Sequence, residues 1–122
     1  MTCRLHFFYI IKQIKRGELL GPLEHIILLA LARLDAGAHG MLVRREIEKR
    51  TGRSLSIGAV YATLERLEAK GYVTSATGKP TAERGGRAKR LFRVAAAGKR
   101  ALQVSHQTIR SMTGLKSRWE AL

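Results

Sequence analysis

LSIGAVYATLERLEAKGYV, residues 55–73, is the stretch from which the fold can be predicted. Its apolar residues recur at helical spacing, which predicts that one stripe of a helix faces a core. These residues are Ile57, Val60, Leu64 and Leu67. Ser56 stands where an N-cap belongs, and Gly71 suits the left-handed residue that closes a helix. The stretch therefore predicts an amphipathic helix between these two residues.

The other face of this helix carries small side chains, where a solvated face would usually carry more Glu and Lys. The small residues expected on it are Ser56, Gly58, Ala59, Ala62 and Thr63. Small side chains let a helix approach a surface closely, such as the floor of a DNA major groove. Close packing against another helix is the alternative. Arg66 is either a DNA contact or a solvated arginine, and Tyr61 either a phosphate contact or half-buried packing.

Two further helices are expected before this one. Pro22 is typical of a first helical position, and residues 23–34 are apolar nearly all round, so this helix should be buried on more than one side. A turn at residues 35–40 leads to a second amphipathic helix at 41–50, and Gly52 ends it. Two helices joined by a tight turn, the second with a small-residue outer face, form the helix-turn-helix pattern.

A basic β-hairpin is expected after the small-faced helix. Residues 72–77 and 88–94 are predicted strands, and the turn between them contains the pair Gly85-Gly86. A basic hairpin directly after a recognition helix is typical of a wing, although a solvated flap is the alternative. The wing residues expected to contact phosphates or the minor groove are Lys79, Arg84, Arg87 and Lys89.

The C-terminal residues 96–122 are expected to form one long helix with an apolar stripe. The stripe consists of Leu102, Ile109, Met112, Leu115, Trp119 and Leu122. Because such a helix extends from a finished domain, its stripe should contact a second copy of the chain across a two-fold axis. The expected division is an N-terminal extension at 1–19, a winged helix-turn-helix domain at 20–95, and the dimerisation helix at 96–122. The extension is either a helix that packs on the dimer partner or the product of an upstream start codon. The fold class is α+β, mainly α.

The charge of the chain indicates a nucleic-acid partner. Its 122 residues contain 23 Lys and Arg against 9 Asp and Glu, a formal net charge of +14. A domain this basic usually binds a polyanion, most often nucleic acid; a ribosome-associated protein and an anionic membrane surface are the alternatives. Cys3 is the only cysteine, so no disulfide framework exists and the reducing cytoplasm is the expected location.

No catalytic, metal or cofactor site is predicted. The four histidines have no metal-ligand spacing with each other or with Cys3. The Gly85-Gly86 pair lies in a hairpin and not between a strand and a helix, so it is no phosphate loop. No acid–base or nucleophile arrangement can be assembled. An enzyme is therefore not expected.

The chain resembles the PadR family of winged helix-turn-helix regulators, in its short form with one C-terminal helix. The resemblance rests on LEHIILLAL (23–31), AHG (38–40), SIGAVYATLERLEAKGYV (56–73), GGRAKRLFRV (85–94) and AAGKRAL (96–102). It implies recognition-helix positions at Tyr61, Thr63 and Arg66 and wing positions at Arg87 and Lys89. The family often has Thr where this chain has Ala95, which should weaken the cap of the last helix.

The resemblance also implies a homodimer that binds a palindromic operator, usually as a repressor. Some relatives release DNA on binding small aromatic or drug-like molecules, which would make Trp119 an effector contact; a dimer contact is its alternative role. A membrane partner is not expected. The rival functions are an RNA- or ribosome-binding basic protein and a winged-helix adaptor that binds protein.

Overall fold

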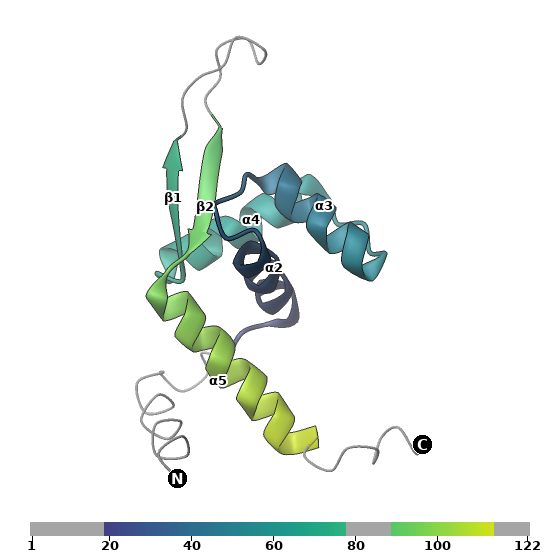
Figure 1. Cartoon of the computed structure of the whole chain (residues 1–122), viewed down its shortest axis with the longest axis vertical. Coiled ribbons are helices and arrows are strands. Elements are labelled where there is room, and N and C mark those ends of the chain that lie inside the picture. Colours follow the sequence, from purple (N-terminus) through teal and green to yellow (C-terminus); the bar gives the residue numbers. More distant parts are fainter. Residues whose placement is uncertain (1–18, 78–88, 114–122) are drawn as a thin grey trace.

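Four helices and a two-stranded antiparallel sheet make up residues 19–77 and 89–113, the part of the chain that the computed structural model describes (Figure 1). The elements are α2 (Pro22–Arg33), α3 (Gly40–Thr51), α4 (Ile57–Ala69), β1 (Val73–Thr77), β2 (Arg90–Val94) and α5 (Ala96–Thr113). The α+β, mainly α class is confirmed. The expected extension up to residue 18, the wing tip at 78–88 and the helix end at 114–122 lie outside the described residues.

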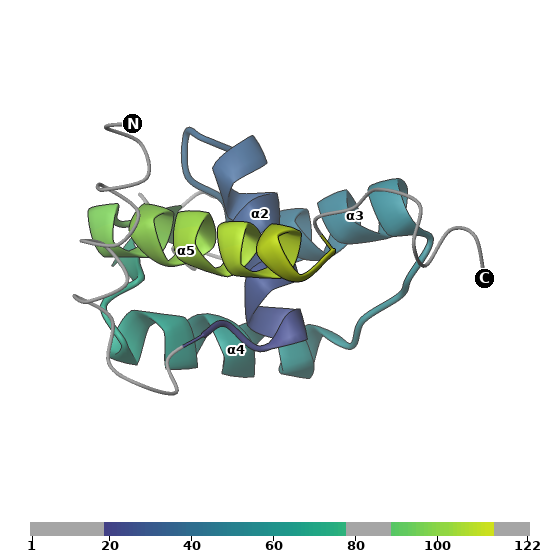
Figure 2. The same ribbon diagram turned by 90° about the horizontal axis from the view of Figure 1, so that it is seen from below.

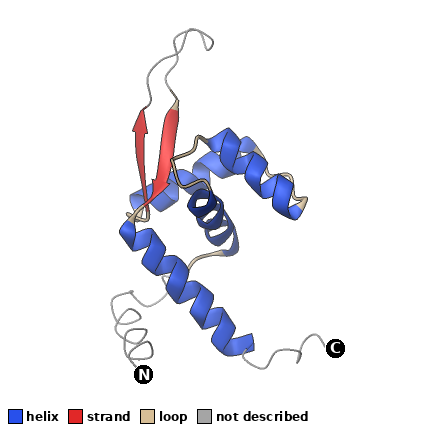
Figure 3. Ribbon diagram, in the orientation of Figure 1, coloured by secondary structure: helices blue, strands red, loops and turns tan. Residues whose placement is uncertain are grey.

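The core lies between α2, α3, α4 and the sheet, and the sheet stands beside the helices (Figure 3). β1 and β2 pair in a register that places Val73 opposite Val94 and Ser75 opposite Phe92. Phe92 of β2 is fully buried, and its side chain belongs to the core that the helices form. The other side chains of the same core with no exposed surface include Ile27, Leu28, Val43, Val60, Leu64 and Leu67. This core fixes α4 relative to the strands.

The predicted boundaries of α4 are confirmed at both ends. The Ser56 hydroxyl accepts a hydrogen bond from the Ala59 backbone N–H at 3.1 Å, as an N-cap does. Gly71 has φ +81°, which L side chains rarely adopt. The Gly71 N–H donates to the Glu68 carbonyl and the Tyr72 N–H to the Leu67 carbonyl, both at 2.9 Å. These two bonds form a Schellman motif that turns the chain directly into β1.

Helix α2 is buried on more than one side, as the sequence predicts, because it packs against α3, α4, α5 and β2. Ile27, Leu28, Ala30 and Leu31 are buried, as expected. Leu29 is 48% exposed, however, because it lies on the side of α2 that no described element covers completely. The continuous apolar run therefore does not correspond to burial all round.

Helix α5 starts against the backbone of the turn before β1, and Gly98 makes this contact. The Ala95 N–H donates to the Tyr72 carbonyl at 2.9 Å. A Cβ added at Gly98 would lie 2.1 Å from the Tyr72 carbonyl oxygen, far inside van der Waals contact. Gly98 thus lets α5 lie close to the chain that enters the sheet.

Gly98→Ala is expected to lower the free energy of unfolding by about 1–3 kcal/mol or more, because two backbone segments must separate. Gly58→Ala is the matched control, since a Cβ at Gly58 meets nothing within 4 Å. That control should be neutral or stabilise the helix by up to about 1 kcal/mol. Urea unfolding of the three proteins measures both changes, and equal stability of Gly98→Ala and the wild type would contradict the close contact.

Candidate nucleic-acid interface

The exposed side of α4 is a row of mostly small residues. Gly58, Ala62, Glu65 and Ala69 are all exposed and follow one another at intervals of four, three and four, so they share one side of the helix. We call this row the α4 face. Ser56 is exposed beside its start, and Ala59 is partly exposed. Helix α4 lies along one edge of the molecule in Figure 2, where no described helix or strand covers its outer side.

The small size of Gly58 has no explanation in the packing of this chain. A Cβ there would have nothing within 4 Å among the described residues, whereas the Cβ of Gly98 would clash with backbone. Packing inside the domain therefore does not account for glycine at position 58. This part of the α4 face is therefore flat and open in the described part of the chain.

Thr63 does not belong to the α4 face, contrary to the expectation from sequence. It is only 1% exposed. Its hydroxyl donates to the Ala59 carbonyl at 2.8 Å and accepts from Arg66 Nη2 at 3.3 Å. Position 63 lies on the same side of the helix as Val60 and Leu67, both buried, and so turns inward. The prediction that Thr63 lines a groove is wrong.

Tyr61 packs against its own domain. The ring is partly buried and meets Phe92 edge-on, with the ring centroids 6.3 Å apart at an interplanar angle of 62°. A Cβ at Gly40 would lie 2.6 Å from Tyr61 Cζ, so the ring occupies the space that glycine leaves at the start of α3. Of the two roles considered for Tyr61, half-buried packing is the one that this geometry shows.

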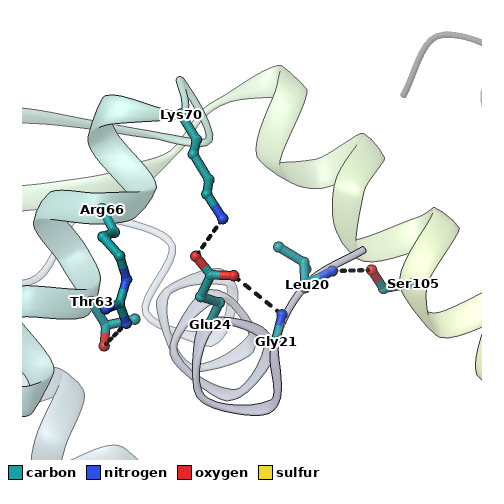
Figure 4. Close-up of polar contacts among 7 residues, drawn as sticks. All are labelled: Leu20, Gly21, Glu24, Thr63, Arg66, Lys70 and Ser105. Carbon is teal, nitrogen blue, oxygen red and sulfur yellow. Dashed lines mark hydrogen bonds and ion pairs between the residues drawn. The ribbon is translucent and has the colours of Figure 1, made fainter. Parts of the chain in front are cut away.

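Arg66 lies on the flank of α4 next to the start of α2 (Figure 4). The residue is exposed, but its guanidinium turns back to the Thr63 hydroxyl. It is also close enough to Glu24 of α2 for its charge to lower the pKa of that carboxyl. In this arrangement Arg66 points toward the flank and not along the α4 face, and it remains a candidate for a phosphate beside the groove.

A buried carboxylate joins the start of α2 to the end of α4, and sequence reasoning missed it. Glu24 is 7% exposed; its Oε2 accepts from Lys70 Nζ at 2.8 Å and its Oε1 from the Gly21 N–H at 3.2 Å (Figure 4). Burial alone would raise the pKa of the Glu24 carboxyl. The hydrogen bonds from Lys70 and Gly21 and the nearby cations outweigh it and hold the pKa below its usual value. The ionised carboxylate thus fixes α4 against α2.

The same segment is joined to α5. The Leu20 N–H donates to the Ser105 hydroxyl at 3.1 Å (Figure 4). The only sequence signal for these contacts is that Glu24 follows Gly21 by three residues, a spacing that is typical of a capping arrangement. Nothing in that signal indicated Lys70 or Ser105 as partners.

The base of the wing is held to α4 by Arg90. Its guanidinium bonds to the Glu68 carboxylate, donates from Nε to the Ser75 hydroxyl at 3.2 Å and lies 4.9 Å from the centroid of the Phe92 ring. It also reaches Glu65 at 3.6 Å. The cation of Arg90 is therefore directed at the protein, and it fixes β2 against α4.

The candidate wing contacts can be placed only in part. Lys89 lies at the described base of the wing and is partly exposed. Lys79, Arg84 and Arg87 lie outside the described residues. Arg93, like Arg90, is used inside the domain, because it donates to the Ala36 carbonyl at 3.0 Å. Not every arginine of the hairpin is free for a polyanion.

The apolar stripe of α5 divides into two parts. The first turns of α5 cover the chain's own core, and they bury Ala101 and Val104. Leu102 lies in these turns and packs against the same core. This corrects the expectation that Leu102 belongs to a stripe with nothing to pack on. Ile109 and Met112 are 55% and 85% exposed, as expected for residues beyond the core. Leu115, Trp119 and Leu122 lie outside the described residues.

The described part of the chain contains neither a metal site nor a membrane-spanning helix. No group of three or more His, Cys, Asp or Glu side chains is arranged to hold a metal ion in residues 19–77 and 89–113. Within the same residues, no helix is both long and apolar enough to cross a bilayer.

A helix-turn-helix whose second helix leads into a two-stranded hairpin, packed on one core, defines a winged helix-turn-helix protein. The comparison with protein families agrees with this class. The PadR-like family of transcriptional regulators is matched over residues 27–104, and the chain belongs to that family. The family consists of transcriptional regulators, which agrees with the prediction that the chain is not an enzyme.

Solved structures share the fold at low sequence identity. A PadR family transcription regulator from Clostridium difficile R20291 is 19% identical, with a TM-score of 0.66 over 81% of this chain and 98% of that one. A transcriptional regulator from Thermoplasma acidophilum is 21% identical, with a TM-score of 0.65 over 82% and 92%. A winged-helix DNA-binding protein from STIV is 17% identical, with a TM-score of 0.58 over 72% and 87%. No curated protein is matched.

Proposed function

We propose that this PadR-like regulator binds duplex DNA in a sequence-specific manner, with the α4 face in the major groove and the wing on the adjacent backbone. The observation that carries the proposal is the α4 face itself. It is exposed, it is flat at Gly58 and Ala62, and packing inside the domain does not explain the glycine. A helix with this face can approach base edges closely.

Charge supports the same partner. The chain carries a formal net charge of +14, and Lys89 lies at the base of the wing that extends from α4. Cations on a hairpin next to a recognition helix would position the protein on the phosphates, while the α4 face reads the bases. Lys79, Arg84 and Arg87 complete the proposed set of wing contacts, together with Ser56, Gly58, Ala59, Ala62 and Arg66 on or beside α4.

We further propose that the regulator acts as a homodimer through α5, in the cytoplasm, and represses transcription from a palindromic operator. The support is the exposed apolar end of α5, where Ile109 and Met112 contact no core. The stripe would continue through Leu115, Trp119 and Leu122. By the resemblance to the family, we also propose that Trp119 contacts a small aromatic effector.

The test is selection of preferred duplexes from a random pool by the full chain, followed by footprinting. We expect two protected half-sites whose centres are about 10 base pairs, one helical turn, or a multiple of it apart. Preferential binding of RNA over every duplex would instead support the rival RNA-binding function and would contradict the proposal.

Ile109→Glu is expected to convert the dimer to monomer, because it places a charge in the proposed apolar contact. The two-half-site footprint should then disappear at protein concentrations that saturate the wild type. Gln107→Glu, an exposed position on the same helix, is the matched control and should leave the dimer intact. Sedimentation at micromolar concentration measures the change, and a dimeric Ile109→Glu protein would exclude this end of α5 from the interface.

A further inference from the structure

Glu65 is the one acidic side chain on the α4 face. The other exposed members of the row are Gly58, Ala62 and Ala69, none of which can reach a base edge with a polar group. Glu65 follows Ala62 by three residues and precedes Ala69 by four, so it stands in the middle of the exposed side. Its side chain is 64% exposed. Any surface that the α4 face approaches must accommodate this carboxylate.

The contact that holds Glu65 within the domain is a loose one. Arg90 Nη1 lies 3.6 Å from Glu65 Oε1, beyond ordinary hydrogen-bond distance, and both side chains are substantially exposed. Ion pairs between exposed groups contribute little to stability. The guanidinium of Arg90 is held by Glu68, Ser75 and the Phe92 ring, so it keeps its place without Glu65. Glu65 can therefore leave Arg90 without disturbing the wing.

The chemistry of a carboxylate restricts what it can contact in a groove. An ionised carboxylate only accepts hydrogen bonds. In the major groove the bases offer donors at the amino groups of cytosine and adenine, and a glutamate typically accepts from cytosine N4. Phosphate oxygens and the acceptor edge of guanine would repel it. A carboxylate on this face thus favours one kind of base edge and disfavours general contact with the phosphate backbone.

We propose that Glu65 is the specificity-determining residue of the α4 face: it accepts a hydrogen bond from a cytosine amino group and lowers affinity for duplexes that lack cytosine at that position. This inference rests on the proposed function. Arg90, held by Glu68, keeps the wing in register while Glu65 turns to the base. The small neighbours Gly58 and Ala62 let the helix approach closely enough for a side chain of this length to reach.

The test is selection from a random duplex pool by three full-length proteins: the wild type, Glu65→Gln and Glu65→Ala. The wild type should select cytosine at one fixed position of each half-site, by roughly tenfold over the other bases. Glu65→Gln should change that preference to adenine, because a glutamine amide pairs with adenine N6 and N7. Glu65→Ala should lose the preference at that position and keep it elsewhere.

A second readout separates base reading from a general effect of charge. On a random duplex, Glu65→Gln should bind several-fold more tightly than the wild type, with a salt slope steeper by up to about 0.9, because a repulsive charge near phosphates is gone. Glu48→Gln removes the same charge from an exposed position on α3 and should leave the base preference unchanged. Because Glu65 and Glu48 are exposed, all variants should have the melting temperature of the wild type.

The outcomes distinguish this inference from the proposed function. If the wild type selects a duplex and Glu65→Gln selects the same one, Glu65 is a solvated partner of Arg90, and only the Glu65 inference is overturned. If the wild type selects no duplex, the proposed function fails and this inference fails with it.

Discussion

Binding of duplex DNA is expected to weaken on the order of a thousandfold when the salt concentration is raised from 50 to 200 mM, as for proteins that make about six or more phosphate contacts. The reason is the net charge of +14, part of which lies on the proposed wing. Each phosphate that a lysine or arginine neutralises releases condensed counterions, so added salt opposes binding. A titration followed by fluorescence anisotropy at four or five salt concentrations measures the slope.

Individual wing cations should account for part of that slope. Lys89→Ala and Arg87→Ala are each expected to make it shallower by about one and to weaken binding to all sequences alike. Arg100→Ala is the matched control, because it removes the same charge from an exposed position on α5. A flat salt response of the wild type would rule out phosphate contacts as the main source of affinity. A loss of slope in Arg100→Ala equal to that in Lys89→Ala would mean that only total charge matters.

Phe92→Ala is expected to lower the free energy of unfolding by about 3–5 kcal/mol, the usual cost of removing a fully buried aromatic side chain. Phe92 has no exposed surface and joins three parts of the domain. Its ring meets Tyr61 of α4 edge-on, and Arg90 lies over it. Its backbone also exchanges hydrogen bonds of 2.9 and 3.0 Å with Ala38, in the turn before α3. The variant should therefore loosen the wing and α4 together.

The matched control for this prediction is Leu91→Ala. Leu91 precedes Phe92 on β2, points to the opposite face of the sheet and is only partly buried. Its truncation should cost clearly less than that of Phe92. Urea unfolding followed by circular dichroism compares the two variants. If they lose the same stability, Phe92 is not the side chain that anchors the sheet to the helices.

The sequence by itself determined helix α4 and most of the α4 face. The stripe of Val60, Leu64 and Leu67 and the caps at Ser56 and Gly71 depend on neighbours within four or five positions along the chain. A helical period therefore predicts them without any knowledge of the rest of the fold. The same period placed Gly58 and Ala62 on the exposed side, where the structure has them.

Only the tertiary structure decided which flank of each helix is covered. The helical period does not show how far the buried side of α4 extends around the helix. It therefore could not predict that Thr63 is buried. It also places Leu102 on one stripe with Ile109, although the core covers the first and leaves the second exposed.

The polar contacts that orient the candidate interface were likewise decided by the tertiary structure. Lys70 and Glu24 are 46 residues apart in the chain, and Arg90 and Glu68 are 22 apart. In the sequence, Arg90 is one basic residue among several of the predicted hairpin, and no local pattern singles out Glu24 for a partner on α4. Their partners are set by how the elements pack, because a pairing across the fold depends on a distance in space that no local pattern encodes.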